Sequence, residues 1–442
     1  MSALACDAAA STGTDAPPLT RLHLTALVVC SLGFMGDLFE LGLAPVMGAV
    51  FSAPGSPANN ADLAFLLASV YVGAVVGTPL VGRAADALGR RTMLVVILVW
   101  LAATSAGAAF AGSISTLTGW RVLAGFALGA YPPVMTSYLS ELIEPRRRAA
   151  LVLAGSAIAL LGAPLGPLVV RHMNTSGLLG LEGWRWGLLS GAIGTAVFAL
   201  AMSRLPESAQ WLAAKGFHGR AALVRARFAR SAPVRLSLPA RGSGRNAANA
   251  ATPPGDVGRL YLLSFLSPWA TVAFPVLSGA VLITKGFRLD DTLLVIAVAA
   301  LGPSIGVLVT SPWLDLVSRR SALLAAASGM GVSGWFFVVE AQVSTVVAAY
   351  TAFIVSAVVY TSITNVFVAE RSPTRRRSTL VSIAWTLNRI SAAVAPFVLL
   401  PMLRRFGAVE MFVVVALTLA ASIVLLWAWR GNDIYVQRQR QG

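Results

Sequence analysis

The polar landmarks of this chain occur twice, at positions 229 residues apart. The recurring pairs are Asp86 and Asp315, Arg90 and Arg319, Arg91 and Arg320, Glu141 and Glu370, Arg148 and Arg377, Gly73 and Gly302, Gly77 and Gly306, and Pro167 and Pro396. Most are charged types, which together make up only 12% of the residues. A single offset that fits all eight pairs indicates two homologous halves fused in one chain.

The chain also contains twelve apolar stretches of about 20 residues, each long enough to cross a bilayer as a helix. They lie near 22–51, 61–82, 91–111, 116–139, 149–170, 185–203, 260–284, 291–312, 320–339, 343–368, 378–401 and 407–429. The pattern predicts an all-α membrane protein with twelve transmembrane helices in two pseudo-symmetric six-helix halves. The expected organisation is a tail over 1–21, a bundle over 22–203, a linker over 204–259, a bundle over 260–429 and a tail over 430–442.

Basic residues predict the orientation, because cytoplasmic loops retain Lys and Arg. With both termini in the cytoplasm, 26 of the 34 basic residues lie on the cytoplasmic side. The net charge of +16 is then a topology signal and a contact with anionic membrane lipid, and nucleic-acid binding is not expected. Only two of the basic residues are lysine, which favours a bacterial inner membrane. The two cysteines offer no metal cluster, and we expect no cofactor.

The loop between the second and third stretches reads GRAADALGRR over 82–91. A helix that ends at Gly82, followed by Asp86 and the pair Arg90 and Arg91, can form a charge lock on helix ends. This loop resembles the signature loop of the major facilitator superfamily. The second copy, over 311–320, keeps Asp315, Arg319 and Arg320 but lacks both glycines.

Two further segments extend the resemblance over almost the whole chain. Glu141 precedes Arg148 by seven residues, as Glu370 precedes Arg377, and in the superfamily such residues form inner gate networks. Solvated interfacial charge is the alternative. PESAQWL, after the sixth stretch, resembles a motif of sugar porters, organic anion and cation transporters, synaptic-vesicle glycoproteins and aromatic-acid/proton symporters. The resemblance implies a transporter that works by alternating access, with niacin transporters in the same branch.

Four charged residues inside predicted spans have no duplicate in the other half: Asp37, Glu40, Arg121 and Arg389. Such charges cost at least about 2.5–3.5 kcal/mol near the bilayer centre and mark functional sites. Asp37 and Glu40 lie three residues apart on one helix face, so they can share a proton as a coupled pair. By resemblance to sugar porters, Arg121 pairs with a first-span carboxylate, and we expect Asp37 as the partner. A purely structural ion pair is the alternative.

Arg389 lies in the eleventh span beside Asn388, one turn after Trp385. A guanidinium fits a carboxylate, and few acids lie nearby, so we expect an anionic substrate there, with Trp385 stacking on a ring. Pairing of Arg389 with Asp37 or Glu40 is the alternative. Further candidates for the substrate site are aromatic residues at similar depth, each of which can equally serve in packing: Tyr131, Phe34, Tyr360 and Trp269.

The sequence thus predicts a monomeric, proton-coupled uptake transporter for a small organic anion, such as a benzoate-like or nicotinate-like aromatic monocarboxylate. Proton coupling is assigned to Asp37, Glu40 and Arg121. A sugar is disfavoured, because the fifth and seventh spans lack Gln and Asn. Two alternatives stay open: an exporter or exchanger of organic cations or drugs, with the acids as the cation site, and a non-transporting membrane sensor. No pattern points to an enzyme.

Overall fold

The structure is a computed structural model that describes residues 19–56, 58–176, 180–234, 254–310, 318–371 and 377–428. Within these residues, twelve spans are long and apolar enough to cross a membrane. The protein is therefore a multi-pass membrane protein of two six-span halves, as predicted. The tail over 1–21 apart from residues 19–21, the whole tail over 430–442 and part of the linker lie outside the described residues.

The first half begins at Arg21, and two of its six spans are built from two helices each. Its helices are α1 (Arg21–Val50), α2 (Asn60–Leu88), α3 (Arg90–Ala109), α4 (Ile114–Ala127), α5 (Tyr131–Leu142), α6 (Pro145–Leu160), α7 (Gly162–Ser176) and α8 (Gly183–Ser203). The fourth span is α4 with α5, and the fifth is α6 with α7. The interruption of the fourth span coincides with Gly129, whose φ of 82° an α-helix cannot continue through.

The second half repeats this order with different local interruptions. Its elements are α11 (Pro254–Pro268), a π-helix η2 (Trp269–Ala273), α12 (Phe274–Thr284), α13 (Leu289–Thr310), α14 (Arg319–Val339), α15 (Val343–Arg371), α16 (Arg377–Phe406) and α17 (Ala408–Trp427). The π-helix follows Pro268 and lies in the middle of the seventh span. Such segments often occur at functional sites.

Helix contacts in the two halves follow the sequence repeat. A Cβ atom on Gly73 of α2 would lie 2.0 Å from the carbonyl oxygen of Val122 in α4. A Cβ atom on Gly302 of α13 would lie 2.7 Å from Cγ2 of Thr351 in α15. Val122 and Thr351 are themselves 229 residues apart. The duplicated glycines therefore keep the same two spans in close contact in each half.

The halves touch at one end of the molecule, which we call the outer end because it carries the loops predicted to face outward. There a Cβ atom on Gly279 of α12 would lie 2.0 Å from the carbonyl oxygen of Pro45 in α1. Phe65 of α2 packs edge-on against Phe397 of α16, with ring centroids 4.9 Å apart. The largest buried apolar cluster runs through these contacts from α1 and α2 into the second half.

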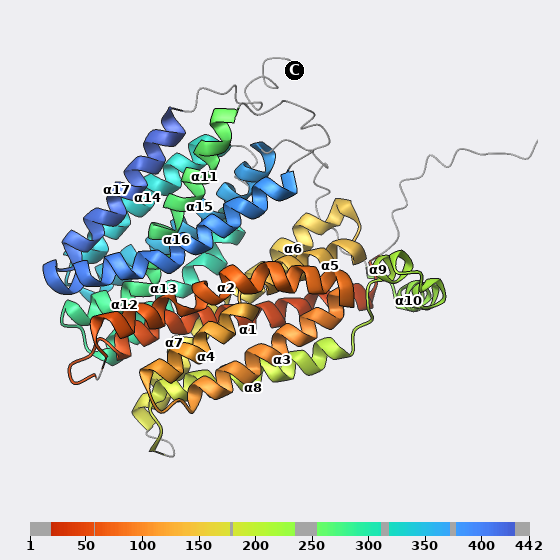
Figure 1. The fold of residues 1–442 in the computed structure, drawn as a ribbon, viewed down its shortest axis with the longest axis horizontal. Coiled ribbons are helices and arrows are strands. Elements are labelled where there is room, and N and C mark those ends of the chain that lie inside the picture. The colour runs from red at the N-terminus through yellow and green to blue at the C-terminus, as the bar shows by residue number, and fades with distance from the viewer. Residues whose placement is uncertain are drawn as a thin grey trace, which may run out of the picture.

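Polar contacts close the outer end on both sides. Nε of Arg171 in α7 donates to the carbonyl oxygen of Asp290 in α13 at 3.2 Å, and Nδ2 of Asn174 donates to the Asp290 carboxylate at 3.4 Å. On the other side, Arg404 of α16 donates to the side-chain oxygen of Asn60 in α2. From this end the halves diverge as a V toward α9 and α10 (Figure 1). These contacts between the halves thus lie at the outer end, and the molecule opens at the opposite end.

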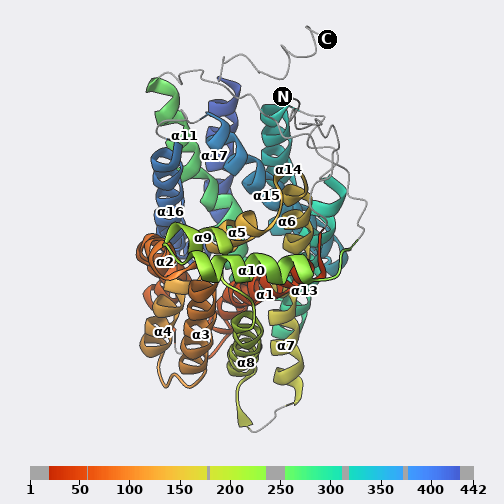
Figure 2. The ribbon, with the colours of Figure 1, turned by 90° about the vertical axis from the view of Figure 1, so that its right-hand side faces the viewer.

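Two helices lie at the inner end, in the segment expected as a linker. They are α9 (Ala209–Ala214) and α10 (His218–Arg230), and Figure 2 shows them lying across the ends of the first half. The chain after α10 pairs with the residue before α1 through a bridge between Thr20 and Pro233. The described part of the linker is thus an ordered extension of the first half.

Candidate functional site

Arg121 of α4 is fully neutralised inside the first half. Its Nη1 donates to Oε2 of Glu40 in α1 at 2.6 Å, and its Nη2 donates to the Glu40 carbonyl oxygen at 3.2 Å. The second carboxylate oxygen of Glu40 accepts from the Ser105 hydroxyl of α3 at 2.6 Å. Both charged side chains are at most 2% exposed. This pair joins α1, α3 and α4 and has little room to change partner.

The expected pairing of Arg121 with Asp37 is wrong. Asp37 is 1% exposed, yet its Oδ1 has no hydrogen-bond partner within the described residues. Three groups interact with its carboxylate: Arg389 of α16, Glu40 and the backbone N–H of Gly129. The two carboxylates of α1 therefore have different surroundings, because Glu40 is held within one half and Asp37 faces the other.

The break in the fourth span lies beside this carboxylate. A Cβ atom on Gly129 would lie 3.3 Å from Nη2 of Arg389 and 3.6 Å from Oγ1 of Thr78 in α2. The Thr78 hydroxyl is buried and has no hydrogen-bond partner among the described residues. Helix α5 begins two residues later and carries prolines in its first turn, so the partial positive charge of its N-terminus lies in the middle of the span.

Arg389 is the second arginine inside a span; it is partly buried, and no carboxylate forms a salt bridge with it within the described residues. Its guanidinium carbon lies 5.3 Å from the centre of the Trp385 ring, a cation–π contact within α16. No salt bridge to Asp37 forms, although the two groups interact electrostatically, and Tyr71 of α2 interacts in the same way. The guanidinium thus retains its hydrogen-bond donors for another partner.

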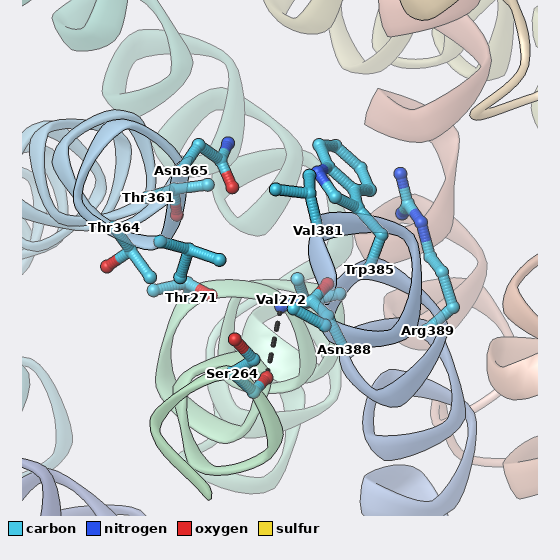
Figure 3. Close-up of a pocket in the computed structure, with 12 residues that line it drawn as sticks. Ser264, Thr271, Val272, Thr361, Thr364, Asn365, Val381, Trp385, Asn388 and Arg389 are labelled. Carbon is cyan, nitrogen blue, oxygen red and sulfur yellow. Dashed lines mark hydrogen bonds between the residues drawn. The ribbon is translucent and has the colours of Figure 1, made fainter. Parts of the chain in front are cut away.

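Arg389 also lines a cavity in the second half (Figure 3). The volume of this cavity is about 110 Å³. Its walls come from α11 with η2, from α15 and from α16: Ser264, Thr271, Val272, Thr361, Thr364, Asn365, Val368, Val381, Ala384, Trp385, Asn388 and Arg389. Thr361 and Asn365 lie on one side, and Trp385 and Arg389 lie on the other. Three predicted substrate residues, Arg389, Trp385 and Asn388, are therefore brought together here.

Most hydroxyl groups of the cavity wall act as acceptors toward a ligand. The hydroxyls of Ser264, Thr271 and Thr364 each donate to the backbone carbonyl four residues earlier, at 2.8–2.9 Å. Asn388 directs its amide N–H groups at the Ser264 carbonyl and the Ser267 hydroxyl, at 3.4 and 3.3 Å. Their oxygen lone pairs remain, so this wall, which we call the acceptor wall (Ser264, Thr271, Thr364 and Asn388), suits a ligand that brings hydrogen-bond donors.

The other four aromatic candidates do not line this cavity in the present conformation. Tyr131 is fully buried, its hydroxyl donates to the Cys30 carbonyl at 3.0 Å, and its ring stacks with that of Phe34 at 6.4 Å. Tyr360 is also fully buried. Trp269 is the first residue of η2 and packs against the apolar core. Their geometry is that of helix packing, and a role in binding stays a prediction.

The signature loop forms its charge lock, but not at Gly82. Helix α2 continues past Gly82 to Leu88 and ends at Gly89, whose φ is 106°, so the expectation that the helix ends at Gly82 is wrong. Arg90 bridges Asp86, with Nη2 at 3.0 Å from Oδ1, and Glu141, with Nε at 3.0 Å from Oε1. The lock therefore ties α2, α3 and α5 of the first half.

The PESAQWL segment completes this lock through Glu207. Its carboxylate accepts from the backbone N–H groups of Arg91 and Thr92 at 2.9 and 3.1 Å, so it caps the start of α3. Arg91 in turn donates to the Leu205 carbonyl at 3.0 Å. The sequence motif thus holds α9 against the signature loop.

The remaining gating residues are only partly described. Arg148 donates to the backbone carbonyls of Ser140 and Ile143, and not to Glu141. In the second half Arg320 donates to the Trp427 carbonyl at 2.7 Å, and Arg319 begins α14. Asp315 lies outside the described residues, as do the side chains of Glu370 and Arg377. The hydrogen bonds that we describe at the inner end join residues of the same half, which agrees with an inward-facing state.

Sequence reasoning did not single out several residues around Arg389. Thr78 and Gly129 belong to apolar stretches in which nothing distinguishes them, apart from the prolines that follow Gly129. Thr271, Thr361 and Thr364 are threonines in apolar helices, where such residues usually bond their own backbone. No group of three or more His, Cys, Asp or Glu residues that could hold a metal occurs in the described ranges.

The fold of two similar six-span halves is one that secondary transporters use. The chain belongs to the Major Facilitator Superfamily, whose sequence profile it matches over residues 25–396. It is 28% identical to the arabinose-proton symporter of Bacillus subtilis over 206 residues, 45% of this chain and 44% of that protein. It is 29% identical to the gallate transporter of Pseudomonas putida over 204 residues, 46% of this chain and 44% of that protein.

The fold is also that of a solved structure. The partially occluded inward-open conformation of the xylose transporter XylE from E. coli superposes with a TM-score of 0.71 at 16% identity, covering 93% of this chain and 97% of that one.

Proposed function

We propose that this protein is a proton-coupled transporter that takes up a small organic anion, an aromatic or heteroaromatic monocarboxylate, by alternating access. The observation that carries the proposal is the guanidinium of Arg389 at the edge of a polar cavity without a salt bridge to any described carboxylate. A cation at this depth needs an anionic partner or water. A substrate carboxylate meets that need with two parallel hydrogen bonds.

The first half supports this assignment by contrast. Arg121 is equally deep and has its carboxylate at 2.6 Å, so it needs no ligand. Of the two, only Arg389 has donors left for a substrate. Trp385, which is 39% exposed, offers an aromatic face next to the guanidinium. A flat ring with a carboxylate fits such a pair, because the ring stacks on indole while the carboxylate reaches the arginine.

The acceptor wall further defines the substrate. Its hydroxyl groups present oxygen lone pairs to a ligand, because their protons are donated to the backbone. A substrate with hydroxyl or amine groups remote from its carboxylate therefore matches the cavity better than an unsubstituted ring. Gallate, whose transporter in Pseudomonas putida is similar to this chain, is an aromatic carboxylate with ring hydroxyls. We therefore place ring-hydroxylated benzoates ahead of benzoate and nicotinate.

Asp37 is the residue that we assign to the proton. It is buried, lacks a partner for one oxygen and faces the substrate arginine across the two halves. In the proposed cycle the outward-open protein takes up a proton on Asp37 and the anion on Arg389, the outer contacts of Asp290 and Asn60 form, and both ligands leave at the inner end. Glu40 and Arg121 serve in this cycle as a structural pair.

A neutral hydroxylated solute is the second candidate, because six of the twelve residues that line the cavity carry a hydroxyl or amide group. The fifth and seventh spans disfavour a sugar by their lack of Gln and Asn, yet Asn365 and Asn388 reach the cavity from the tenth and eleventh. The similarity to an arabinose-proton symporter points the same way. A neutral solute would leave Arg389 without a function in binding.

Uptake into proteoliposomes under an imposed inward proton gradient tests the proposal. We expect radiolabelled 4-hydroxybenzoate to accumulate, and Arg389→Ala to weaken its binding by about ten- to a hundredfold, because charge-assisted hydrogen bonds are lost. Arg405→Ala, which removes an exposed arginine at the outer end of the same helix, serves as the matched control and should transport normally. Accumulation of arabinose but of no carboxylate, with Arg389→Ala fully active, would instead establish the neutral solute.

A further inference from the structure

The groups around Arg389 leave donors and one acceptor unmatched at the boundary of the two halves. On the donor side are the guanidinium, which has no salt bridge to a described carboxylate, and the Thr78 hydroxyl, which has no partner among the described residues, while the N–H of Gly129 faces the Asp37 carboxylate. On the acceptor side is the Asp37 carboxylate, with one oxygen unbonded. Buried polar groups that remain unsatisfied are costly, so such a cluster indicates space for an exchangeable partner.

The positions of these donors converge from three elements. Gly129 approaches Arg389 so closely that a Cβ atom there would lie 3.3 Å from Nη2, and the same Cβ atom would lie 3.6 Å from Oγ1 of Thr78. The positive φ of Gly129 opens the fourth span, so its N–H is not used in a regular helix. A carboxylate bound by Arg389 on this side would therefore also lie next to the start of α5, where anions are stabilised.

We propose that Asp37 and the substrate carboxylate compete for this one anion site. In the empty protein the deprotonated Asp37 carboxylate balances the charge of Arg389 and accepts from the N–H of Gly129, and protonation of Asp37 releases these groups to the substrate. The inference rests on the proposed function and extends it, because it makes the shared arginine the coupling element and assigns Gly129 and Thr78 to the substrate's carboxylate.

Competition between Asp37 and the substrate carboxylate requires the proton to bind for the anion to bind. Without a proton, the Asp37 carboxylate repels a second carboxylate at the same guanidinium and so weakens binding of the substrate anion. With the proton bound, the net charge of the site changes from balanced to positive, and the anion restores the balance. One proton therefore enters with each anion, and the free energy of the proton gradient is coupled to the anion without a change in the Glu40 pair.

The other groups facing Asp37 do not offer an equivalent switch. Arg121 is held by Glu40, and Tyr131 donates to a backbone carbonyl. Helices α6, α7, α8 and α13, which pack on α1, carry their charged residues only near their ends, and α12 carries none. The titratable and charged groups around Asp37 in the described residues are Cys30 and Glu40 of α1, Tyr71 of α2, Arg121 of α4, Tyr131 of α5 and Arg389 of α16.

The test is the pH dependence of substrate affinity, measured with 4-hydroxybenzoate on the purified protein in detergent over a pH range in which the carboxylate of the probe stays ionised. For the wild type we expect affinity to fall with rising pH, approaching about tenfold per unit on the alkaline side, because one proton must bind with each anion. Asp37→Asn should bind independently of pH, as tightly as the wild type at low pH. Asp37→Ser should do the same, which shows that the result does not come from the amide group of the introduced Asn.

A matched control is Asp62→Asn, which neutralises a partly exposed acid at the outer start of α2 and should keep the wild-type profile. The inference is overturned if Asp37→Asn retains the wild-type pH dependence, or if it binds as poorly as Arg389→Ala. Binding that requires Arg389 but ignores Asp37 would reject only the competition. Failure of every carboxylate to bind the wild type at any pH would reject the proposed function as well.

Discussion

The two arginines buried in the membrane lie in opposite halves and have opposite environments. Arg121 is held by Glu40 and is nearly inaccessible, whereas Arg389 borders a cavity, lies against Trp385 and Gly129, and has no salt bridge to a described carboxylate. The scaffold around them is the same, because equivalent glycines hold equivalent helices together in both halves. Duplication therefore produced two similar helix scaffolds. The arginine without a salt bridge in one of them, Arg389, marks the place where a ligand is needed.

The largest effect that separates the two arginines should be on stability. Arg121→Ala leaves Glu40 charged and buried with only Ser105 as a partner, and the loss of one member of a buried pair costs about 3–5 kcal/mol. Arg389→Ala removes a cation that has no salt bridge, so we expect little change or a small gain. Thermal unfolding of the purified variants in detergent measures both.

A double variant sharpens this contrast. Arg121→Met combined with Glu40→Gln removes both charges and should recover most of the stability that Arg121→Ala loses. If Arg389→Ala were as unstable as Arg121→Ala, Arg389 would be a structural residue and the comparison would fail.

A smaller effect distinguishes the duplicated glycine contacts. At Gly73 a new Cβ atom meets a backbone oxygen at 2.0 Å, while at Gly302 it meets a methyl group of Thr351 at 2.7 Å. Side chains can move aside more easily than backbone, so Gly73→Ala should destabilise by about 1–3 kcal/mol and Gly302→Ala by less. The same unfolding measurement compares them, and an equal loss in both would show that the two halves tolerate strain alike.

The smallest effect concerns two helix starts that are equivalent by the repeat. The start of α3 is capped from a distance by Glu207, and the start of α14 is capped locally by the Ser318 hydroxyl, which accepts from the backbone N–H of Ser321 at 3.1 Å. Removing either cap by substitution with Ala should cost about 0.5–2 kcal/mol. Hydrogen exchange should quicken in both α3 and α9 for Glu207→Ala, but only in α14 for Ser318→Ala. Unchanged exchange in α9 would argue against Glu207 as its anchor.

Much of the architecture was predictable because it follows from local and additive properties. Apolar stretches of the required length predicted each span, and the fixed offset predicted two halves. Charged residues without duplicates predicted Arg389 as a site residue, and its place beside Trp385 and Asn388 in the cavity wall agrees with that hypothesis. The role of these residues in binding remains to be tested by the substitutions above.

The pairing of the charges could not be predicted in the same way. Asp37 and Glu40 are separated by three residues, a rise of about 4.5 Å and a rotation of about 60° around the helix. Either could have met Arg121, and the resemblance to sugar porters favoured the wrong one. The angle at which α4 and α16 cross α1 decides which carboxylate each guanidinium reaches.

The sequence by itself determined the number of spans, their order, the duplication and the few membrane charges that the duplication does not explain, because hydrophobic length and charge type act residue by residue. Only the tertiary structure decided that Glu40 neutralises Arg121, that the opened fourth span directs Gly129 toward Arg389, and that polar side chains of α11, η2, α15 and α16 form one wall. These outcomes depend on distances between segments far apart in the chain, and such distances follow from helix packing and not from composition.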